Sequence, residues 1–214
     1  MAGQANATSQ PPLAQRAVAA WQRLVDHLPS QCFVCQRWPS PWLCANCSLH
    51  HGHTVVRRCP RCALTLPATS DVCPDCLRDA PVLRHCHAAV DYSPPWDRLV
   101  LQFKFHQQLA WARHMAQLTL QSPIAEQALT QADVILPIPL SSQRLRERGY
   151  NQAVLLAQAL QRKNNNTAPI QPHWLLRIND TPAQAQLGRA ARLRNLRHAF
   201  ALEPQYAPLL ARKQ

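Results

Sequence analysis

The chain has 214 residues, of which 47% are hydrophobic, and a formal net charge of +12. This length accommodates one medium-sized domain and a smaller one, and no apolar run approaches the roughly 18 residues of a transmembrane helix. The basic charge favours an anionic partner, either nucleic acid or a phosphorylated metabolite. The alternative is a basic, solvated surface that only aids solubility.

Glycine is scarce, and its four positions are Gly3, Gly52, Gly149 and Gly188. A Walker loop and a dinucleotide-binding fingerprint both need closely spaced glycines, which let the backbone approach the phosphates. The sequence therefore excludes both kinds of glycine-rich phosphate site.

The N-terminal residues 1–30 are expected to form a flexible tail that carries a short amphipathic helix at 13–28. Arg16, Arg23 and Asp26 interrupt the apolar residues of this segment, so it lacks the uninterrupted apolar stretch of a signal peptide. We therefore expect a cytoplasmic location and no membrane insertion.

Residues 31–83 are predicted to form a double zinc ribbon. Eight of the nine cysteines form four CxxC pairs: Cys32/Cys35, Cys44/Cys47, Cys59/Cys62 and Cys73/Cys76. A CxxC turn places two sulfurs on one side of a tight loop, so two turns supply a tetrahedral shell of four thiolates. Consecutive pairing predicts two zinc ions, one per ribbon. Eight thiolates (−8) together with two zinc ions (+4) would lower the net charge from +12 to about +8.

Three alternatives to this assignment stay open. In an interleaved arrangement, the first CxxC pair would share its ion with the third pair. Iron or an iron–sulfur cluster could also use the same cysteine ligands in place of zinc. His50, His51 and His53 are rival ligands close to Cys47. Disulfides are disfavoured because a cytoplasmic chain keeps its thiols reduced.

From residue 84 onwards the pattern changes to alternating strand and helix signals. Helices are expected at 94–106, 109–121, 151–163 and near 191–200, and strands at 87–92, 132–140 and 173–178. Alternation of this kind is typical of an α/β domain with a mainly parallel sheet. Trp96 and Trp111 lie at helical spacing, which favours a place in the core over stacking on nucleic acid.

The chain resembles the ComF family of competence-related proteins, which includes GntX-like proteins. The resemblance rests on LPIPL at 136–140, RERGYNQ at 146–152 and RLRNLRHAF at 192–200, all behind a double CxxC ribbon. The matching positions are Lys104, Pro137, Pro139, Arg146, Arg148, Gly149, Asn151, Gln152, Gln186, Leu187, Arg192, Asn195 and Phe200. The resemblance implies a type I phosphoribosyltransferase-like domain at 84–214. It also implies cytoplasmic action on incoming single-stranded DNA, or on its use as a nutrient, during natural competence.

One family feature is missing. The family's site for phosphoribosyl pyrophosphate (PRPP) is an acidic pair followed by a Thr-Thr-Gly turn, and neither occurs before the last residue, Gln214. We therefore expect a C-terminally truncated domain without catalytic residues. Two alternatives stay open. One is a phosphoribosyltransferase whose PRPP-binding segment, with its Mg²⁺, is missing from the sequence. The other is a zinc-ribbon adaptor that binds nucleic acid or a protein of the DNA-uptake machinery.

The stretch RLRERGYNQ at 144–152 is interpreted as a phosphate-side loop. The residues expected to face the ligand are Arg144, Arg146, Arg148, Asn151, Gln152, Arg192 and Arg197. The alternative places the arginines in solvent at a helix N-terminus, where cations are unfavourable. If the two basic segments form one surface, it should bind single-stranded DNA weakly, without base preference and with strong salt dependence.

Overall fold

The computed structural model describes residues 30–52, 56–181, 188–196 and 198–210. The chain divides into two compact units, and the boundary follows Ser48. The helix expected at 13–28 lies outside the described residues. Among the described residues, no helix is long and apolar enough to cross a membrane.

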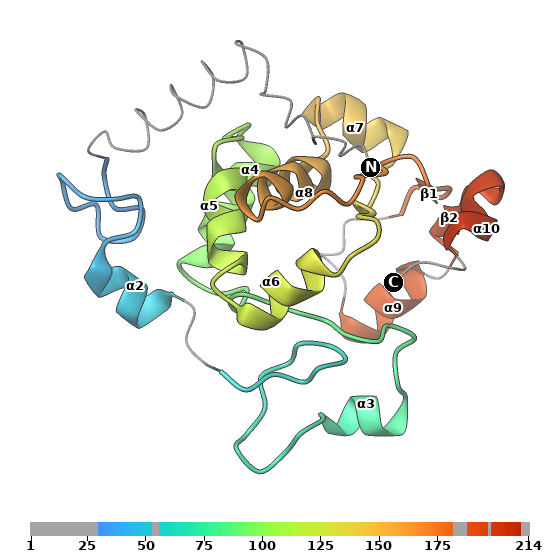
Figure 1. The fold of residues 1–214 in the computed structure, drawn as a ribbon, viewed down its shortest axis with the longest axis horizontal. Coiled ribbons are helices and arrows are strands. Elements are labelled where there is room, and N and C mark those ends of the chain that lie inside the picture. The colour runs from blue at the N-terminus through green and yellow to red at the C-terminus, as the bar shows by residue number, and fades with distance from the viewer. Residues whose placement is uncertain (1–29, 53–55, 182–187, 197, 211–214) are drawn as a thin grey trace, which may run out of the picture. The chain divides into compact units, whose positions relative to one another are not determined.

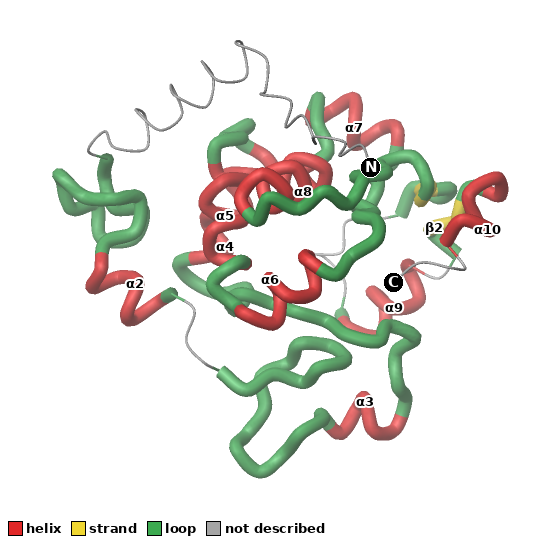
Figure 2. Tube along the Cα trace, viewed as in Figure 1, coloured by secondary structure: helices red, strands yellow, loops and turns green. Residues whose placement is uncertain are grey.

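Helices dominate the second unit, whereas the described part of the first unit is mostly loop (Figures 1 and 2). In chain order the elements are α2 (Ala45–His51), α3 (Pro74–Arg78), α4 (Trp96–Phe105), α5 (Trp111–Thr119), α6 (Pro123–Thr130), α7 (Ser142–Arg148), α8 (Gln152–Lys163), β1 (Leu175–Arg177), α9 (Arg189–Leu196), β2 (Phe200–Leu202), the 3₁₀ helix η2 (Pro204–Tyr206) and α10 (Ala207–Leu210).

The first unit has a core made largely of cysteine. Ser30 and Ser40 close its loop by an antiparallel bridge, in which each backbone N–H donates to the other residue's carbonyl. Cys32, Cys44 and Cys47 are buried inside this loop. So little apolar surface does not hold a fold of this size by itself, and small modules of this kind rely on a metal or on disulfides.

A second loop of the same design opens the second unit. Arg58 and Thr65 form its antiparallel bridge. Its core consists of Cys59, Leu66, Cys73 and Cys76, with Val72 packed against them. The two cysteine loops therefore lie in different compact units, and the second one shares its unit with the helices that follow.

Three helices, α4, α5 and α8, form the main core of the second unit, where they lie side by side in Figure 1. Phe103 of α4 is buried among Ala112 and Ala116 of α5 and Ala159 of α8. Alanine at these positions lets the helices approach closely around the phenylalanine ring. The helices predicted at 94–106, 109–121 and 151–163 are thereby confirmed.

The mainly parallel sheet predicted for this domain is not seen among the described residues. Their one sheet, β1–β2, is antiparallel and pairs Leu175 with Leu202. The segment expected as a strand at 132–140 makes only an isolated parallel bridge, between Ile135 and Ile170. A physical reason is that Pro137 and Pro139 lack the N–H that a ladder needs. Residues 87–92, also expected as a strand, adopt irregular structure.

The stretch interpreted as a phosphate-side loop contains a helix instead. The Oγ of Ser141 accepts from the backbone N–H of Arg144 at 3.4 Å and begins α7. Gly149 ends α7 with a φ of 77°, in the left-handed region that glycine adopts without strain. Arg146 and Arg148 therefore lie in the last turn, where cations interact favourably with the helix dipole. The alternative that placed the arginines at a helix N-terminus is therefore wrong for Arg146 and Arg148, whereas Arg144 does lie in the first turn of α7.

Candidate functional site

The eight paired cysteines gather into two clusters in consecutive order. The sulfurs of Cys32, Cys35, Cys44 and Cys47 all lie within 4.8 Å of one another, and so do those of Cys59, Cys62, Cys73 and Cys76. The structure does not interleave the pairs. Of the rival histidine ligands, His50 and His51 belong to neither cluster, and His53 lies outside the described residues.

The spacing of the sulfurs fits one metal ion per cluster. The Sγ atoms of Cys35 and Cys44 are 3.7 Å apart, and those of Cys62 and Cys73 are 3.6 Å apart. A tetrahedral shell with metal–sulfur bonds of about 2.3 Å has edges of about 3.8 Å. A disulfide bond is only about 2.05 Å long, so these sulfurs have the separation of co-ligands and not of a covalent bond.

Backbone amides point at the sulfurs in both clusters. The N–H of Cys47 donates to the Sγ of Cys44, and that of Cys76 donates to the Sγ of Cys73, both at 3.4 Å. The N–H of Cys44 donates to the Sγ of Cys32 at 3.5 Å. These donors stabilise negative charge on sulfur, which is the form that binds a metal.

The acidities of the thiols differ sharply within each cluster. Burial raises the pKa of Cys32, but backbone hydrogen bonds from Cys35, Cys44 and Val34 outweigh it and lower this pKa to about 6. Burial and the neighbouring thiols raise the pKa of Cys47 to about 12. Four thiolates therefore do not coexist at neutral pH without a cation, and a divalent ion supplies the missing positive charge.

The second cluster repeats this contrast. A backbone hydrogen bond from Cys73, joined by others from Arg61 and Cys62, lowers the pKa of Cys59 to about 6. Burial and the other thiols raise the pKa of Cys76 to about 12. Each Cys₄ cluster can thus hold a metal ion in the same way.

The helical part of the second unit contains a pocket of about 590 Å³. This volume lies within the range of about 300–1,000 Å³ that is usual for small-ligand sites. The lining residues are Tyr92, Leu101, Lys104, Phe105, Gln107, Ile138, Pro139, Leu140, Arg144, Glu147, Arg148, Tyr150, Gln152, Ala153 and Arg177. They come from α4, α7, the start of α8, the Pro-containing segment before α7, and β1.

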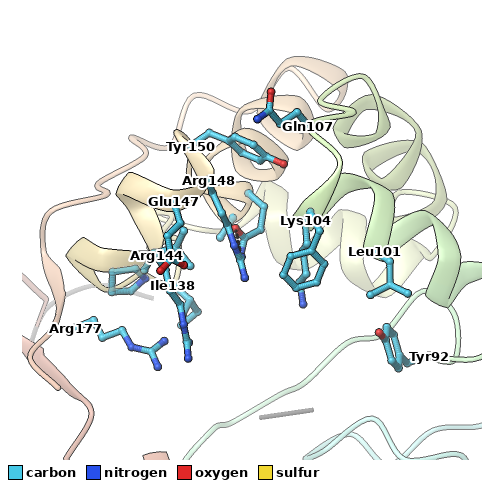
Figure 3. Close-up of a pocket in the computed structure, with 15 residues that line it drawn as sticks. Tyr92, Leu101, Lys104, Gln107, Ile138, Arg144, Glu147, Arg148, Tyr150 and Arg177 are labelled. Carbon is cyan, nitrogen blue, oxygen red and sulfur yellow. Dashed lines mark hydrogen bonds between the residues drawn. The ribbon is translucent and has the colours of Figure 1, made fainter. Parts of the chain in front are cut away.

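Cations dominate the charge of this pocket. Lys104, Arg144, Arg148 and Arg177 line it together with the single carboxylate Glu147 (Figure 3). Within the described part of the chain, none of these four cations forms an ion pair with a carboxylate. The carboxylate of Glu147 instead accepts from the side-chain amide of Gln143 at 2.9 Å. The charges of Glu147 and Asp180 act on Arg148 and Arg177, but four cations against one lining carboxylate leave the pocket with an excess of positive charge.

Neutral groups hold three of the cations in place. Arg148 donates to the side-chain oxygen of Gln152 at 3.1 Å, and its guanidinium carbon lies 4.8 Å from the centroid of the Phe105 ring. Arg144 donates to the carbonyl of Thr181, and Arg177 donates to the hydroxyl of the same threonine. The guanidinium groups are thereby oriented while their charge stays available to a ligand.

Lys104 differs from the arginines because its ammonium group has no hydrogen-bond or ion-pair partner among the described residues. Burial, and next to it the positive charge of Arg148, lower the pKa of Lys104 below its ordinary value. Burial and the charge of Arg144 likewise lower the pKa values of Arg148 and Arg177. The cations therefore destabilise one another in the absence of an anion.

The structure separates the residues expected to face a ligand into three groups. Arg144, Arg148 and Gln152 line the pocket. Asn151 lies beside it, where its side-chain amide donates to the carbonyl of Ile138 at 3.1 Å and its oxygen caps α8. Arg146 and Arg192 are exposed and do not line the pocket, and Arg197 lies outside the described residues.

Sequence reasoning did not place Lys104, Arg177 or Tyr150 in the site. The hydroxyl of Tyr150 donates to the carbonyl of Phe103, so this tyrosine joins the start of α8 to α4. Lys104 belongs to the motif LQFKF, whose apolar periodicity hides the one charged position. Arg177 is the one cation of an otherwise apolar strand, β1. A single cation among apolar strand residues was the feature that could have indicated its place in the site.

Several known proteins are similar to this chain. DNA utilization protein YhgH of Salmonella typhimurium is 33% identical over 192 residues, which cover 82% of this chain and 79% of that protein. Competence protein F of Haemophilus influenzae is 31% identical and covers 67% of this chain and 63% of its own length. Competence protein ComFC of Bacillus subtilis is 28% identical and covers 66% and 58%.

No protein-family model and no solved structure matches the chain. The match with YhgH nevertheless covers most of both proteins. From this similarity we conclude that the chain belongs to the ComF family.

Proposed function

We propose that this protein acts in the uptake or utilisation of DNA, as the names of its relatives say of them, and that its pocket binds phosphate groups of single-stranded DNA. The observation that carries the proposal is that one pocket gathers the cations Lys104, Arg144, Arg148 and Arg177, none of which forms an ion pair with a carboxylate of the described residues. The proposal assigns binding and not catalysis to the pocket.

A phosphodiester chain suits this pocket for an electrostatic reason. Burial and mutual repulsion lower the pKa values of Lys104, Arg148 and Arg177, so bringing these cations together costs free energy in the unliganded protein. An anion that binds there relieves the repulsion. Each bound phosphate also releases condensed counterions, which favours association at low salt.

We propose that zinc occupies both cysteine clusters. Four thiolates in a closed tetrahedral shell are typical of structural zinc, and the clusters leave no position open for a reacting molecule. When bound, zinc supplies the cross-link that replaces a hydrophobic core. Reduced, clustered cysteines also support a cytoplasmic location for the protein.

We propose further that residues 84–214 form a phosphoribosyltransferase-like domain behind a double zinc ribbon at 31–83. The parallel bridge supports this fold: the N–H of Ile135 donates to the carbonyl of Pro169 at 3.0 Å, and that of Gln171 donates to the carbonyl of Ile135 at 2.9 Å. Two helices, α7 and α8, separate the bridged segments. Parallel pairing across a helical connection is the arrangement of a βαβ unit.

Binding of a fluorescein-labelled oligothymidine to the full, metal-loaded chain, measured by anisotropy, tests the pocket. If the four cations each neutralise one phosphate, log K should fall with log salt with a slope of about −3, which is about 50-fold between about 50 mM and about 200 mM salt. Lys104→Met and Arg144→Ala should each weaken binding and make the slope shallower by about 0.7.

Two matched variants control for general charge. Arg146→Ala removes an exposed arginine from α7, the helix that carries Arg144, and Lys163→Met removes an exposed lysine at the end of α8. If binding weakens equally in the pocket variants and in these controls, the DNA contacts the basic surface and not the pocket. Absence of binding at low salt would reject the proposed function.

A further inference from the structure

The pocket also has apolar lining residues, some of which carry aromatic rings. Tyr92 is 69% exposed, Phe105 is 59% exposed and Leu101 is 41% exposed, although all three line the pocket. Figure 3 shows Tyr92 and Leu101 at one side, Arg144 and Arg177 at the other, and Lys104 between them. Large apolar side chains that stay exposed beside a charged pocket are typical of a surface that a ligand covers.

Phe105 links the two sides of the pocket. The guanidinium carbon of Arg148 lies over the Phe105 ring, 4.8 Å from its centroid. More than half of the phenylalanine surface is nevertheless exposed. A planar guanidinium and an aromatic ring both present flat faces, and nucleic-acid bases stack on flat faces of either kind.

Tyr92 is held in place by its neighbour in the chain. The carboxylate of Asp91 accepts from Arg58 at 2.8 Å and from the hydroxyl of Thr65 at 3.4 Å, and both donors belong to the second cysteine loop. The bond from Arg58 lowers the pKa of Asp91, so the pair stays ionised. The second cluster thus fixes the backbone beside Tyr92, while the tyrosine hydroxyl has no hydrogen-bond partner among the described residues.

A free phosphate or pyrophosphate would use the cations and leave these rings uncovered. A nucleotide of a single strand has both chemistries, a phosphate at one end and a flat base at the other. We propose that the pocket binds a nucleotide unit of single-stranded DNA, with its base against Tyr92 and Phe105 and its phosphates at Lys104, Arg144 and Arg148. The inference rests on the proposed function and adds base stacking to phosphate binding.

Stacking predicts binding that needs a base but accepts any base. Every base has a flat aromatic face, and stacking on side chains therefore discriminates little between them. The affinity for oligothymidine and for an oligonucleotide of mixed sequence should be similar. The affinity for a strand of the same length and charge without bases should be lower.

The test compares labelled oligothymidine with an abasic, tetrahydrofuran-containing strand of equal length, using the metal-loaded full chain at low salt. The unmodified protein should bind oligothymidine more tightly. Tyr92→Ala should weaken oligothymidine binding by about 5- to 150-fold, the loss typical of one stacked base, and leave abasic binding unchanged. Tyr92→Phe, which keeps the ring, should retain the preference, and Phe105→Leu should reduce it.

The outcomes separate the two proposals. Equal binding of both strands by the unmodified protein overturns base stacking and leaves phosphate binding intact. A preference for oligothymidine that survives in both Tyr92→Ala and Phe105→Leu overturns the placement of the base. Failure to bind either strand at low salt overturns the proposed function and this inference together. Unchanged metal content and thermal melting of each variant confirm that the fold is retained.

Discussion

The cysteine clusters and the basic pocket pose the same electrostatic problem with opposite sign. Each cluster gathers four groups that must all become negative to bind a metal, and its thiol pKa values spread from about 6 for Cys32 to about 12 for Cys47. The pocket gathers four cations, and burial together with repulsion between the cations lowers the pKa values of Lys104, Arg148 and Arg177 instead. In neither region do the described protein groups neutralise this charge.

The two regions differ in what the missing counter-charge does. In the clusters a bound metal ion completes a core that is made largely of cysteine, so metal binding and folding depend on each other. The pocket lies beside an apolar helical core of Phe103, Ala112 and Ala116, which does not need an anion. We therefore expect the clusters to govern stability and the pocket to govern binding.

The largest expected effect is loss of a cluster ligand. Cys59→Ser should remove one of two metal ions and unfold the loop around residues 56–79, because structural zinc contributes on the order of 10–16 kcal/mol to small metal modules at neutral pH. Elemental analysis together with circular dichroism measures both effects. The first cluster should keep its ion. A variant that retains two metal ions and its fold would contradict the expectation that the clusters govern stability.

A smaller change in stability, of opposite sign, is expected when a cation is removed from the pocket. Lys104→Met roughly keeps the length of the side chain and removes a half-buried charge that Arg148 repels, so the free energy of unfolding at neutral pH should be unchanged or higher by up to about 1 kcal/mol. DNA binding should weaken in the same variant. Denaturant unfolding at fixed metal content measures the difference. Clear destabilisation would show that Lys104 supports the fold.

The difference in the free energy of unfolding between Lys104→Met and the unmodified protein should depend on pH in one direction. The pKa of Lys104 is lower in the folded chain than its ordinary 10.5, so the unfolded chain binds more protons between the two values. The cost of the charge is therefore fully present at neutral pH and decreases as the pH rises through this window. The stability gap between Lys104→Met and the unmodified protein should narrow as the pH approaches 10.5.

The smallest effect is expected where the second cluster meets the pocket. Arg58→Ala removes the ion pair with Asp91, whose side chain is 59% exposed, so we expect a loss of only about 0.5 kcal/mol and two retained metal ions. Differential scanning calorimetry and elemental analysis check both expectations. Loss of the second ion would mean that Arg58 belongs to the cluster and is more than a support for Tyr92.

The cluster ligands could be predicted from sequence because their spacing is local. Each CxxC turn brings its own two sulfurs together, and only the pairing of neighbouring turns, such as Cys35 with Cys44, depends on the fold. Arg144, Arg148 and Gln152 were predictable because they share one motif. Lys104 and Arg177 were not, since tertiary packing alone brings α4 and β1 to the pocket.

The elements of the fold were also predictable only where their signal is local and strong. Helices with clear apolar periodicity, such as α4 and α8, follow from the sequence. Helix α7 was missed because its arginine-rich stretch has no apolar stripe, and its signals were the caps Ser141 and Gly149. The segment at 132–140 has the composition of a buried strand, but its prolines restrict its pairing to a single parallel bridge at Ile135.

The central claim is that the pocket, and not the basic surface at large, binds the phosphates of single-stranded DNA. The most direct test is a titration of the isotopically labelled, metal-loaded protein with oligothymidine, followed by NMR of the arginine and lysine side chains. We predict that the signals of Lys104, Arg144, Arg148 and Arg177 shift together and saturably, while those of Arg146 and Arg162 stay in place. Shifts confined to Arg146, Arg192 and other exposed cations, with the pocket signals unchanged, would contradict the claim.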